Sequence, residues 1–318
     1  MKTPSLPESG SQPVLTDSPM ENPLLYARSV SRALNIVGDR TALLLMYWVF
    51  LGVYRFAELQ IKTGLSKSLV SSRLKRLEQQ GVLERRAYQG GRYEYHLTPM
   101  GKDLYAVALA LIRWDKQWHY SPDCVTHHLV HKQCGKEFMP APVCTHCNHE
   151  FEARSCDWHY GPGKPDKELS KESGSRRSRI PPAALDVEHP IMDRSLEILG
   201  DRWTALTIAA AFYRVRTFSG FQLALGIASN ILSDRLGRLV ALGIFSERQH
   251  SRSEYRLTEQ GLALFPLIVC LMRWGDKWLA DDGGPALVLV HRSCNTLLEP
   301  LMRCDQCNEA LHFGDFHL

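Results

Sequence analysis

The sequence lacks the features that mark membrane-spanning and exported chains. No apolar stretch approaches the roughly 18 residues that a bilayer-spanning helix needs, and the longest, residues 41–53, is typical of a buried helix. No basic segment followed by an apolar one stands near residue 1, so we see no signal peptide. Charge of one sign is not in large excess, since the formal net charge is only +4. We therefore expect a cytoplasmic protein whose partners only the local distribution of charge can indicate.

One module occurs twice in the chain. A length of 318 residues suits two domains rather than one core, and 44% apolar with 23% charged residues is normal for a globular protein. The repeat is visible where Gly38–Arg40 returns as Gly200–Arg202, and where Glu94–Thr98 returns with one change as Glu254–Thr258. A chain with two copies of one module is built like a dimer whose subunits are fused.

Two short helices joined by a turn are predicted in the middle of the first copy. The segment 56–63 has the pattern of an amphipathic helix, and Gly64 follows it as the turn. Ser66 is a good N-cap for a helix at 67–80, which Gly81 ends in the expected C-terminal position. This arrangement is that of a helix-turn-helix.

The elements around this pair complete a winged form of the motif. Residues 33–50 have helical apolar spacing, and residues 82–86 and 93–97 predict a two-stranded hairpin. Thr98 as N-cap and Pro99 at the first helical position then open a long helix. The second copy follows the same order. We therefore expect a mainly α fold with small β wings, in two tandem winged helix-turn-helix domains.

Composition and pattern set the expected segment boundaries. Residues 1–22 and 157–186 lack periodicity, which predicts a disordered tail and a basic flexible linker. The two winged helix-turn-helix domains are expected at 23–120 and 187–280. Each is followed by a short Cys/His-rich hairpin, at 121–156 and 281–318.

The helix at 67–80 is the expected recognition helix. Such a helix enters the major groove of duplex DNA, so its outward face must carry hydrogen-bonding and cationic groups. That face is rich in serine, a mediocre helix former that solubility alone does not require. Arginines of the hairpin add candidate phosphate contacts. The candidate DNA-binding residues of the first copy are Ser66, Lys67, Ser68, Ser71, Ser72, Lys75, Arg85, Arg86 and Arg92.

The second copy has a weaker reading face. Ala228 stands where the first copy has its capping serine, and Asp234 replaces a serine and disfavours phosphate. Gly237 costs its helix roughly 1 kcal/mol relative to alanine. The candidate contacts of this copy are Ser229, Asn230, Ser233, Arg238 and Arg252. We expect an asymmetric pair on an imperfect operator, with a purely scaffolding second copy as the alternative.

Segments of both copies match one family: 32–40, 56–59 and 71–85 in the first, and 194–204, 232–236 and 253–261 in the second. In these segments the chain resembles the HxlR-type winged-helix transcriptional regulators. The resemblance implies a DNA-binding repressor or activator that works as a homodimer through its terminal helices. Duplex DNA and a second copy of the chain are therefore expected partners, and the effector stays open. Many members carry a sensing cysteine before the first helix, but this chain has Arg28 and Pro190 there, so sensing by that route is not expected.

Six of the nine cysteines fall in two clusters with identical spacing. Clustered Cys-x2-Cys pairs in a reducing compartment are more often metal ligands than disulfides, and structural Zn²⁺ prefers four thiolate or imidazole ligands. We expect up to two structural Zn²⁺ ions, one in each copy, in zinc-ribbon-like hairpins. Thiols without metal are the alternative. The expected ligands are His131, Cys134, Cys144 and Cys147 in the first copy, and His291, Cys294, Cys304 and Cys307 in the second.

These features favour a sequence-specific DNA-binding regulator that uses the recognition helices and wings of a fused pseudo-dimer. The main alternative is a zinc-containing adaptor for protein partners, in which the winged helices serve as scaffold. An RNA-binding winged-helix protein is a further alternative. A redox enzyme using Cys144 and Cys147 is disfavoured, because the pair does not follow a βαβ pattern. We therefore do not expect an enzyme.

Overall fold

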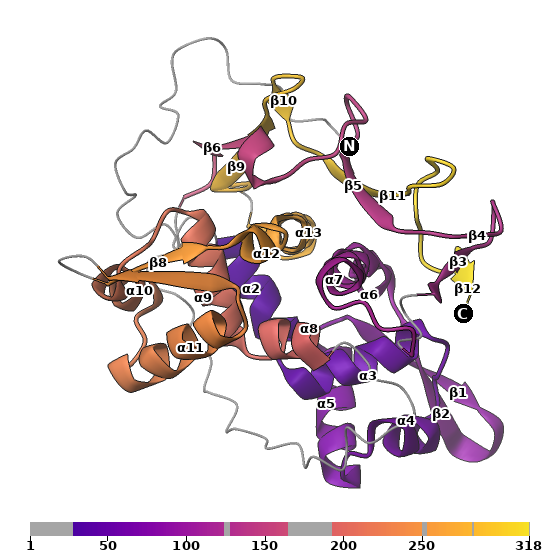
Figure 1. Cartoon of the computed structure of the whole chain (residues 1–318). Coiled ribbons are helices and arrows are strands. Elements are labelled where there is room, and N and C mark those ends of the chain that lie inside the picture. Colours follow the sequence, from indigo (N-terminus) through magenta and orange to yellow (C-terminus); the bar gives the residue numbers. More distant parts are fainter. Residues whose placement is uncertain (1–27, 124–127, 165–192, 250–252, 282, 318) are drawn as a thin grey trace. The chain divides into compact units, whose positions relative to one another are not determined.

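The computed structural model of the chain describes residues 28–123, 128–164, 193–249, 253–281 and 283–317 (Figure 1). The chain divides into two units, and each is considered by itself. The α5 unit comprises residues 32–141, 170–206 and 302–318. The α11 unit comprises residues 1–31, 142–169 and 207–301. Each unit is named after its recognition-type helix, and each takes chain from both sequence repeats.

The α5 unit contains the first winged helix-turn-helix (Figure 1). Its helices and strands run in the order predicted from the sequence, which confirms the fold of this domain. The elements are α3 (Arg40–Phe50), α4 (Phe56–Thr63), α5 (Lys67–Gln79), β1 (Leu83–Tyr88), η1 (Gln89–Gly91), β2 (Arg92–Leu97), α6 (Pro99–Asp103) and α7 (Tyr105–Trp118). From the Cys-rich segments and the second repeat come β3 (Val130–His131), β4 (Lys136–Glu137), α8 (Asp193–Leu199) and β12 (Phe316–His317).

Local signals set the ends of these helices. Gly64 ends α4 in the left-handed conformation, with φ at 62°, and the Ser66 hydroxyl caps α5. The Thr98 hydroxyl accepts a hydrogen bond from the Gly101 backbone N–H at 3.1 Å at the start of α6. The long helix expected from Thr98 onward differs from the prediction, because it breaks at Leu104 into α6 and α7.

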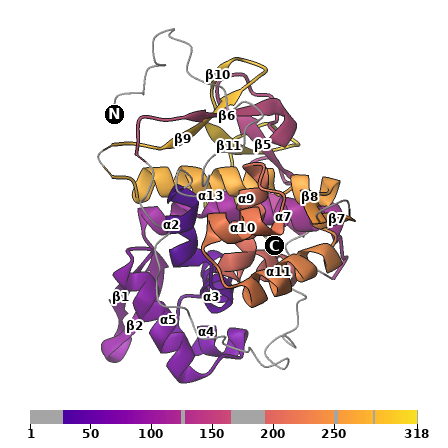
Figure 2. The same cartoon turned by 90° about the vertical axis from the view of Figure 1, so that its left-hand side faces the viewer.

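The wing of the α5 unit is a regular antiparallel hairpin (Figure 2). Leu83 lies opposite Leu97 at its base, and Tyr88 lies opposite Arg92 at its tip. The turn between them contains Gly90 at φ 71°, a backbone conformation that residues with a Cβ rarely adopt. The hairpin therefore carries its side chains in a fixed register beside α5.

The α11 unit contains most of the second winged helix-turn-helix. Its elements are η3 (Ala153–Ser155), β6 (Cys156–Tyr160), α10 (Phe218–Leu225), α11 (Ser229–Ala241), β7 (Phe245–Gln249), β8 (Ser253–Leu257), α12 (Glu259–Leu262), α13 (Phe265–Trp278), β9 (Leu287–His291) and β10 (Thr296–Leu297). The boundary between the units falls inside α2 (Arg28–Val37), α9 (Arg202–Phe212), β5 (Pro140–Cys144) and β11 (Pro300–Cys304).

The Cys-rich segments form short strands, as expected, but each small sheet combines both repeats. In the α5 unit, β12 of the second repeat pairs with β3 of the first, which places Phe316 opposite His131. In the α11 unit, β6 of the first repeat pairs with β9 of the second, which places Cys156 opposite His291. Chain segments have therefore been exchanged between the repeats.

The linker expected at 157–186 overlaps strand β6, which extends to Tyr160. Trp158 holds this strand in place, because its ring packs on Tyr213 and Phe265 with centroid distances of 4.7 and 6.1 Å. The rest of the expected linker, from residue 165, and the expected tail at 1–22 lie outside the described residues. Within the described ranges, no helix is both long and apolar enough to cross a membrane.

Candidate nucleic-acid interface and metal clusters

Helix α5 presents a polar face to solvent. Val70, Leu74 and Leu77 are at most 1% exposed, so they anchor the opposite face in the core. The Ser66 hydroxyl accepts from the Leu69 N–H at 3.4 Å, as expected of an N-cap. The outward face is exposed at every position predicted from the sequence: Ser66, Lys67, Ser68, Ser71, Ser72 and Lys75.

Two arginines on α5 hold the helix to the domain. The Arg73 guanidinium contacts both carboxylate oxygens of Asp39, at 3.0 and 3.1 Å, and the Thr41 hydroxyl at 3.0 Å. Arg76 donates to the backbone carbonyl of Asn35 at 2.9 Å. The bidentate pairing of Arg73 with Asp39 fixes the orientation of the Arg73 side chain as well as its distance from Asp39. Sequence reasoning did not predict this clamp, although the repeated Gly-Asp-Arg and Arg-Leu motifs were its visible signal.

The three wing arginines differ in how free their charges are. Arg85 is paired with Glu78 at 2.7 Å, and that hydrogen bond raises the pKa of the guanidinium. Arg86 is paired with Glu84 at 2.6 Å. All three are exposed, but Arg92 has no ion pair with any described residue, and neither have Lys67 and Lys75. These three cations are therefore the ones most available to phosphate.

Helix α11 has a less suitable surface. Ala228 makes no side-chain cap, as its identity predicts. Arg235 is only 8% exposed and is paired with the neighbouring Asp234, so it cannot serve as a surface cation. The predicted contacts Ser229, Asn230, Ser233 and Arg238 are exposed on the helix. The predicted contact Arg252 lies outside the described residues.

All eight predicted metal ligands gather into two groups of four, but not in the grouping expected from the sequence. We expected each repeat to supply a complete site. The structure instead takes a His-x2-Cys pair from one repeat and a Cys-x2-Cys pair from the other. The group in the α5 unit is His131, Cys134, Cys304 and Cys307, and the group in the α11 unit is Cys144, Cys147, His291 and Cys294.

The ligand atoms of the α5 unit are spaced as a tetrahedral metal requires. Zn–S bonds of about 2.3 Å and Zn–N bonds of about 2.0–2.1 Å separate two sulfur ligands by about 3.8 Å, and a sulfur from a nitrogen by about 3.6 Å. Cys134 Sγ lies 3.9 Å from Cys304 Sγ. His131 Nδ1 lies 3.5 Å from Cys134 Sγ and 3.3 Å from Cys307 Sγ. A disulfide would need about 2.05 Å, so these are separate thiols.

The group in the α11 unit has nearly the same geometry. Cys144 Sγ lies 3.9 Å from Cys294 Sγ. His291 Nδ1 lies 3.3 Å from Cys147 Sγ and 3.6 Å from Cys294 Sγ. His291 is fully buried. Three cysteine sulfurs and one imidazole nitrogen at tetrahedral spacing fit Zn²⁺ and leave no position for a reactive water, so the donor set suits a structural ion.

Exchange of strands explains why the expected grouping was wrong. The spacing within one repeat is compatible with a site of its own, and spacing carries no information on which strand the hairpin pairs with. The pairing of β12 with β3 brings the second Cys-x2-Cys segment to His131. The same logic in the α11 unit brings Cys144 and Cys147 to His291 by way of β6 and β9. Only the three-dimensional arrangement reveals this.

Two of the cysteines that the structure describes, Cys156 and Cys270, lie apart from the clusters. Burial raises the pKa of Cys156 to about 11 and that of Cys270 to about 12. Both therefore stay protonated at neutral pH, and they behave as packed core residues rather than reactive thiols.

The chain is similar to proteins that are named as helix-turn-helix transcriptional regulators. An uncharacterized HTH-type transcriptional regulator of Mycobacterium tuberculosis (strain CDC 1551 / Oshkosh) is 41% identical over 137 residues, which are 41% of this chain and 87% of the relative. The uncharacterized regulator YvaP of Bacillus subtilis (strain 168) is 30% identical over 95 residues, which are 28% of this chain and 88% of that protein. Both names are those of regulators rather than enzymes.

One solved structure and one family model also match parts of the chain. The crystal structure of PA1607, a proposed transcription factor, is 32% identical and covers 46% of this chain and 98% of PA1607, with a TM-score of 0.36. The HxlR-like helix-turn-helix model matches residues 36–122 and 198–282, one region in each repeat. These regions together make up more than half of the chain. The chain therefore belongs to the HxlR-like helix-turn-helix family.

Proposed function

We propose that this chain is a sequence-specific regulator that reads duplex DNA mainly through helix α5. The observation that carries the proposal is the exposed face of α5, where four serines and two lysines lie opposite a fully buried apolar line. Hydroxyl and ammonium groups at the N-terminal end of a recognition helix are suited to base edges in the major groove. The Asp39–Arg73 clamp supports this role, because it holds the helix in one orientation.

The wing is proposed to contact the phosphate backbone. Arg92 stands at its tip and has no ion pair within the described part of the chain, whereas Arg85 and Arg86 would have to exchange Glu78 and Glu84 for phosphate. Contacts of this kind supply affinity without sequence information, and they make binding salt-dependent.

The second repeat is proposed to contribute less. Helix α11 lacks a capping side chain and carries Asp234 on its exposed face. Asn230 is suited to hydrogen bonding with adenine. The chain would then act as a fused pseudo-dimer on an imperfect operator, with α5 reading the stronger half. A homodimer of whole chains through the long helices stays a prediction.

Zn²⁺ is proposed to bind both Cys/His groups in a structural role. When bound, it would supply four metal–ligand bonds that tie the ends of the two repeats together within each unit. In the α5 unit it would join His131 and Cys134 to Cys304 and Cys307. In the α11 unit it would join His291 and Cys294 to Cys144 and Cys147. This exchange gives a reason for carrying two copies in one chain, since neither site is complete with the ligands of one repeat.

Selection from a random-sequence duplex library tests the proposed DNA reading directly. The full chain, purified without chelator, is expected to enrich one asymmetric sequence, with log affinity falling linearly against log salt concentration. Single-stranded RNA of equal length serves as the competitor. If no duplex sequence is enriched even at low salt, the DNA-binding proposal fails and the adaptor alternative gains support. Preferential retention of RNA would favour an RNA-binding role instead.

A further inference from the structure

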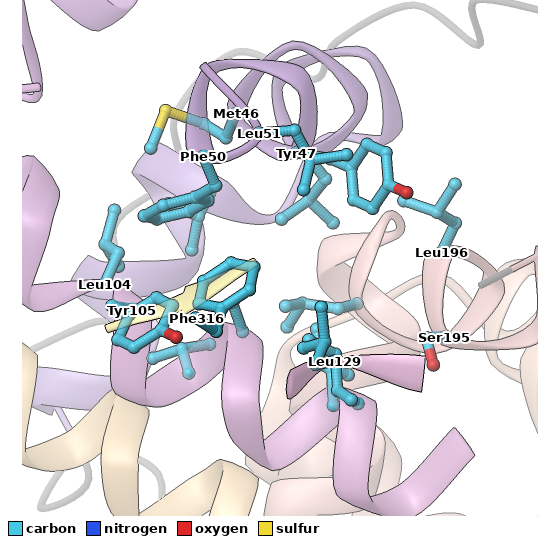
Figure 3. Close-up of a pocket in the computed structure, with 17 residues that line it drawn as sticks. Met46, Tyr47, Phe50, Leu51, Leu104, Tyr105, Leu129, Ser195, Leu196 and Phe316 are labelled. Carbon is cyan, nitrogen blue, oxygen red and sulfur yellow. The ribbon is translucent and has the colours of Figure 1, made fainter. Parts of the chain in front are cut away.

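The α5 unit contains an apolar pocket that neither the DNA-reading face nor the metal groups use. It encloses about 70 Å³ and is partly open to solvent. Figure 3 shows it between α3, which contributes Met46 and Phe50, and α7, which contributes Tyr105. Leu196 of α8 and Phe316 of β12 close it from the second repeat. The lining residues include no charged side chain, so the pocket suits an uncharged molecule.

Two hydroxyl groups among the lining residues are buried without hydrogen-bond partners among the described residues. Ser195 of α8 is 1% exposed and Tyr105 of α7 is 4% exposed. They lie on different sides of the pocket in Figure 3. A buried hydroxyl without a partner is costly, and burial raises the pKa of Tyr105, so its phenol stays a neutral donor. Such groups become satisfied when a ligand brings a polar atom.

For each hydroxyl, the equivalent position of the other repeat shows that the fold does not require it. By sequence register, Tyr105 corresponds to Phe265 and Ser195 corresponds to Ala33. Both counterparts are buried, at 1% and 0% exposure. The hydroxyls of the α5 unit are therefore an addition to a shared apolar framework, and packing alone does not explain them.

The α11 unit fills the space beside Phe265 with other rings. Phe151, Trp158 and Phe212 lie around it, with ring centroids at 6.3, 6.1 and 5.4 Å. In the α5 unit the equivalent residue, Tyr105, also packs among rings, with Phe50, Phe313 and Phe316 at centroid distances of 6.0, 6.1 and 5.7 Å. Both positions therefore lie among aromatic rings, and Tyr105 in addition borders the pocket.

We infer that the pocket of the α5 unit binds a small, uncharged aromatic compound that carries one hydroxyl or carbonyl oxygen. The apolar wall would receive the ring, and the Tyr105 hydroxyl would donate a hydrogen bond to the oxygen. A cavity of about 150 Å³ lined by apolar side chains is large enough for benzene. The enclosed volume here is smaller, so the ring would enter from the open side and lie partly in the mouth.

The pocket is linked to the DNA-reading helix through α3. Met46 and Phe50 line the pocket, and Asp39 and Thr41 at the other end of α3 hold Arg73 of α5. A ligand that favours one position of α3 would therefore also favour one position of α5. This regulatory consequence rests on the proposed function, whereas binding of the ligand does not.

Titration of the full chain with phenol, toluene and benzoate tests the pocket without any DNA. Phenol is expected to bind saturably with one molecule per chain, measured by calorimetry and by NMR of the protein. Toluene should bind about 3- to 10-fold more weakly, because it lacks the oxygen. Benzoate should not bind measurably, because its charge would be buried. Absence of saturable phenol binding, or equal binding of phenol and toluene, would overturn the proposal.

Variants that copy the equivalent residue of the other repeat separate a ligand site from an accidental cavity. The double variant Tyr105→Phe with Ser195→Ala should bind phenol only as weakly as toluene and leave toluene binding unchanged. Ala108→Ile, which introduces the residue of the equivalent position Ile268, should fill the pocket and abolish binding of both. Tyr213→Phe removes an equally buried, unpartnered hydroxyl from the α11 unit and should change neither. Phenol binding that survives Ala108→Ile would contradict the assignment.

The regulatory consequence is measured separately. Saturating phenol should change the affinity of the chain for its selected duplex at least about 3-fold, and the Tyr105→Phe, Ser195→Ala variant should show no such change. Phenol binding without any duplex binding would refute the proposed function but support the proposed ligand site. Duplex binding without phenol binding would refute the proposed ligand site and leave the proposed function standing.

Discussion

Asp39 in the first repeat and Asp201 in the second perform the same local task. Each ends one helix and caps the next, accepting a hydrogen bond from the Ala42 N–H at 3.0 Å and from the Thr204 N–H at 2.8 Å. The same is true of Thr98 and its counterpart in the second repeat, which both cap the helix after the wing. The scaffold of the module has thus been kept in both copies.

The surfaces of the two copies have changed independently of that scaffold. Ser66 and Lys67 of the first reading helix correspond to Ala228 and Ser229 of the second. Tyr105, which lines the pocket of the α5 unit, corresponds to Phe265 of the α11 unit, which has no hydroxyl. Because the caps hold the helices of the module and the exposed residues do not, a duplicated module is free to diverge in what it binds.

The largest expected effect concerns the metal groups, because structural Zn²⁺ in small sites contributes on the order of 10 kcal/mol. The double variant Cys134→Ser with Cys304→Ser disables one group as the structure pairs them, so one tightly bound Zn²⁺ per chain should remain. Cys134→Ser with Cys144→Ser removes the same number of thiols from one repeat and disables both groups. Elemental analysis with chelator competition measures the difference. If Cys134→Ser with Cys304→Ser lost both ions and Cys134→Ser with Cys144→Ser lost only one, each site would instead be formed by the ligands of a single repeat.

The next effect tests whether the first repeat dominates DNA reading. Lys67→Ala with Lys75→Ala should weaken binding to the selected duplex about 10- to 100-fold and reduce the slope against log salt by about 2, because two phosphate contacts are lost. The matched variant Asn230→Ala with Arg238→Ala should cost less than about 5-fold. Fluorescence anisotropy over a salt series measures both. Equal losses in the two variants would show that the copies read DNA equally.

Local structure was predictable from the sequence because its causes are local. Ser66, Gly64 and Thr98 act within a few residues of themselves, and the structure confirms each as a cap or turn. The hairpin of the wing follows from alternation and glycine for the same reason. The break at Leu104 was missed because good helical spacing continues across it.

The contacts that were missed join distant parts of the chain. Asp39 and Arg73 are on different helices, and their identities alone do not show that they meet. Cys134 meets Cys304 because strands are exchanged, which no spacing rule encodes. The repeat itself concealed this, since a complete set of four ligands in each copy made a self-contained site the simpler interpretation.

The smallest expected effect concerns the first residues of helices α5 and α11. A single substitution at the N-cap of each helix should make it resemble the other helix. Ser66→Ala removes the hydroxyl that accepts from the Leu69 N–H, and it should destabilise α5 by about 0.5–1 kcal/mol. Ala228→Ser supplies the missing cap and should stabilise α11 by a similar amount. Native-state hydrogen exchange reports on the two helices separately. Ser71→Ala is the control, because it removes an exposed serine from the same helix without touching the cap and should not lower stability. If both exchanges change stability in the same direction, the cap does not explain the difference between the two helices, and Asp234 and Gly237 become its main source.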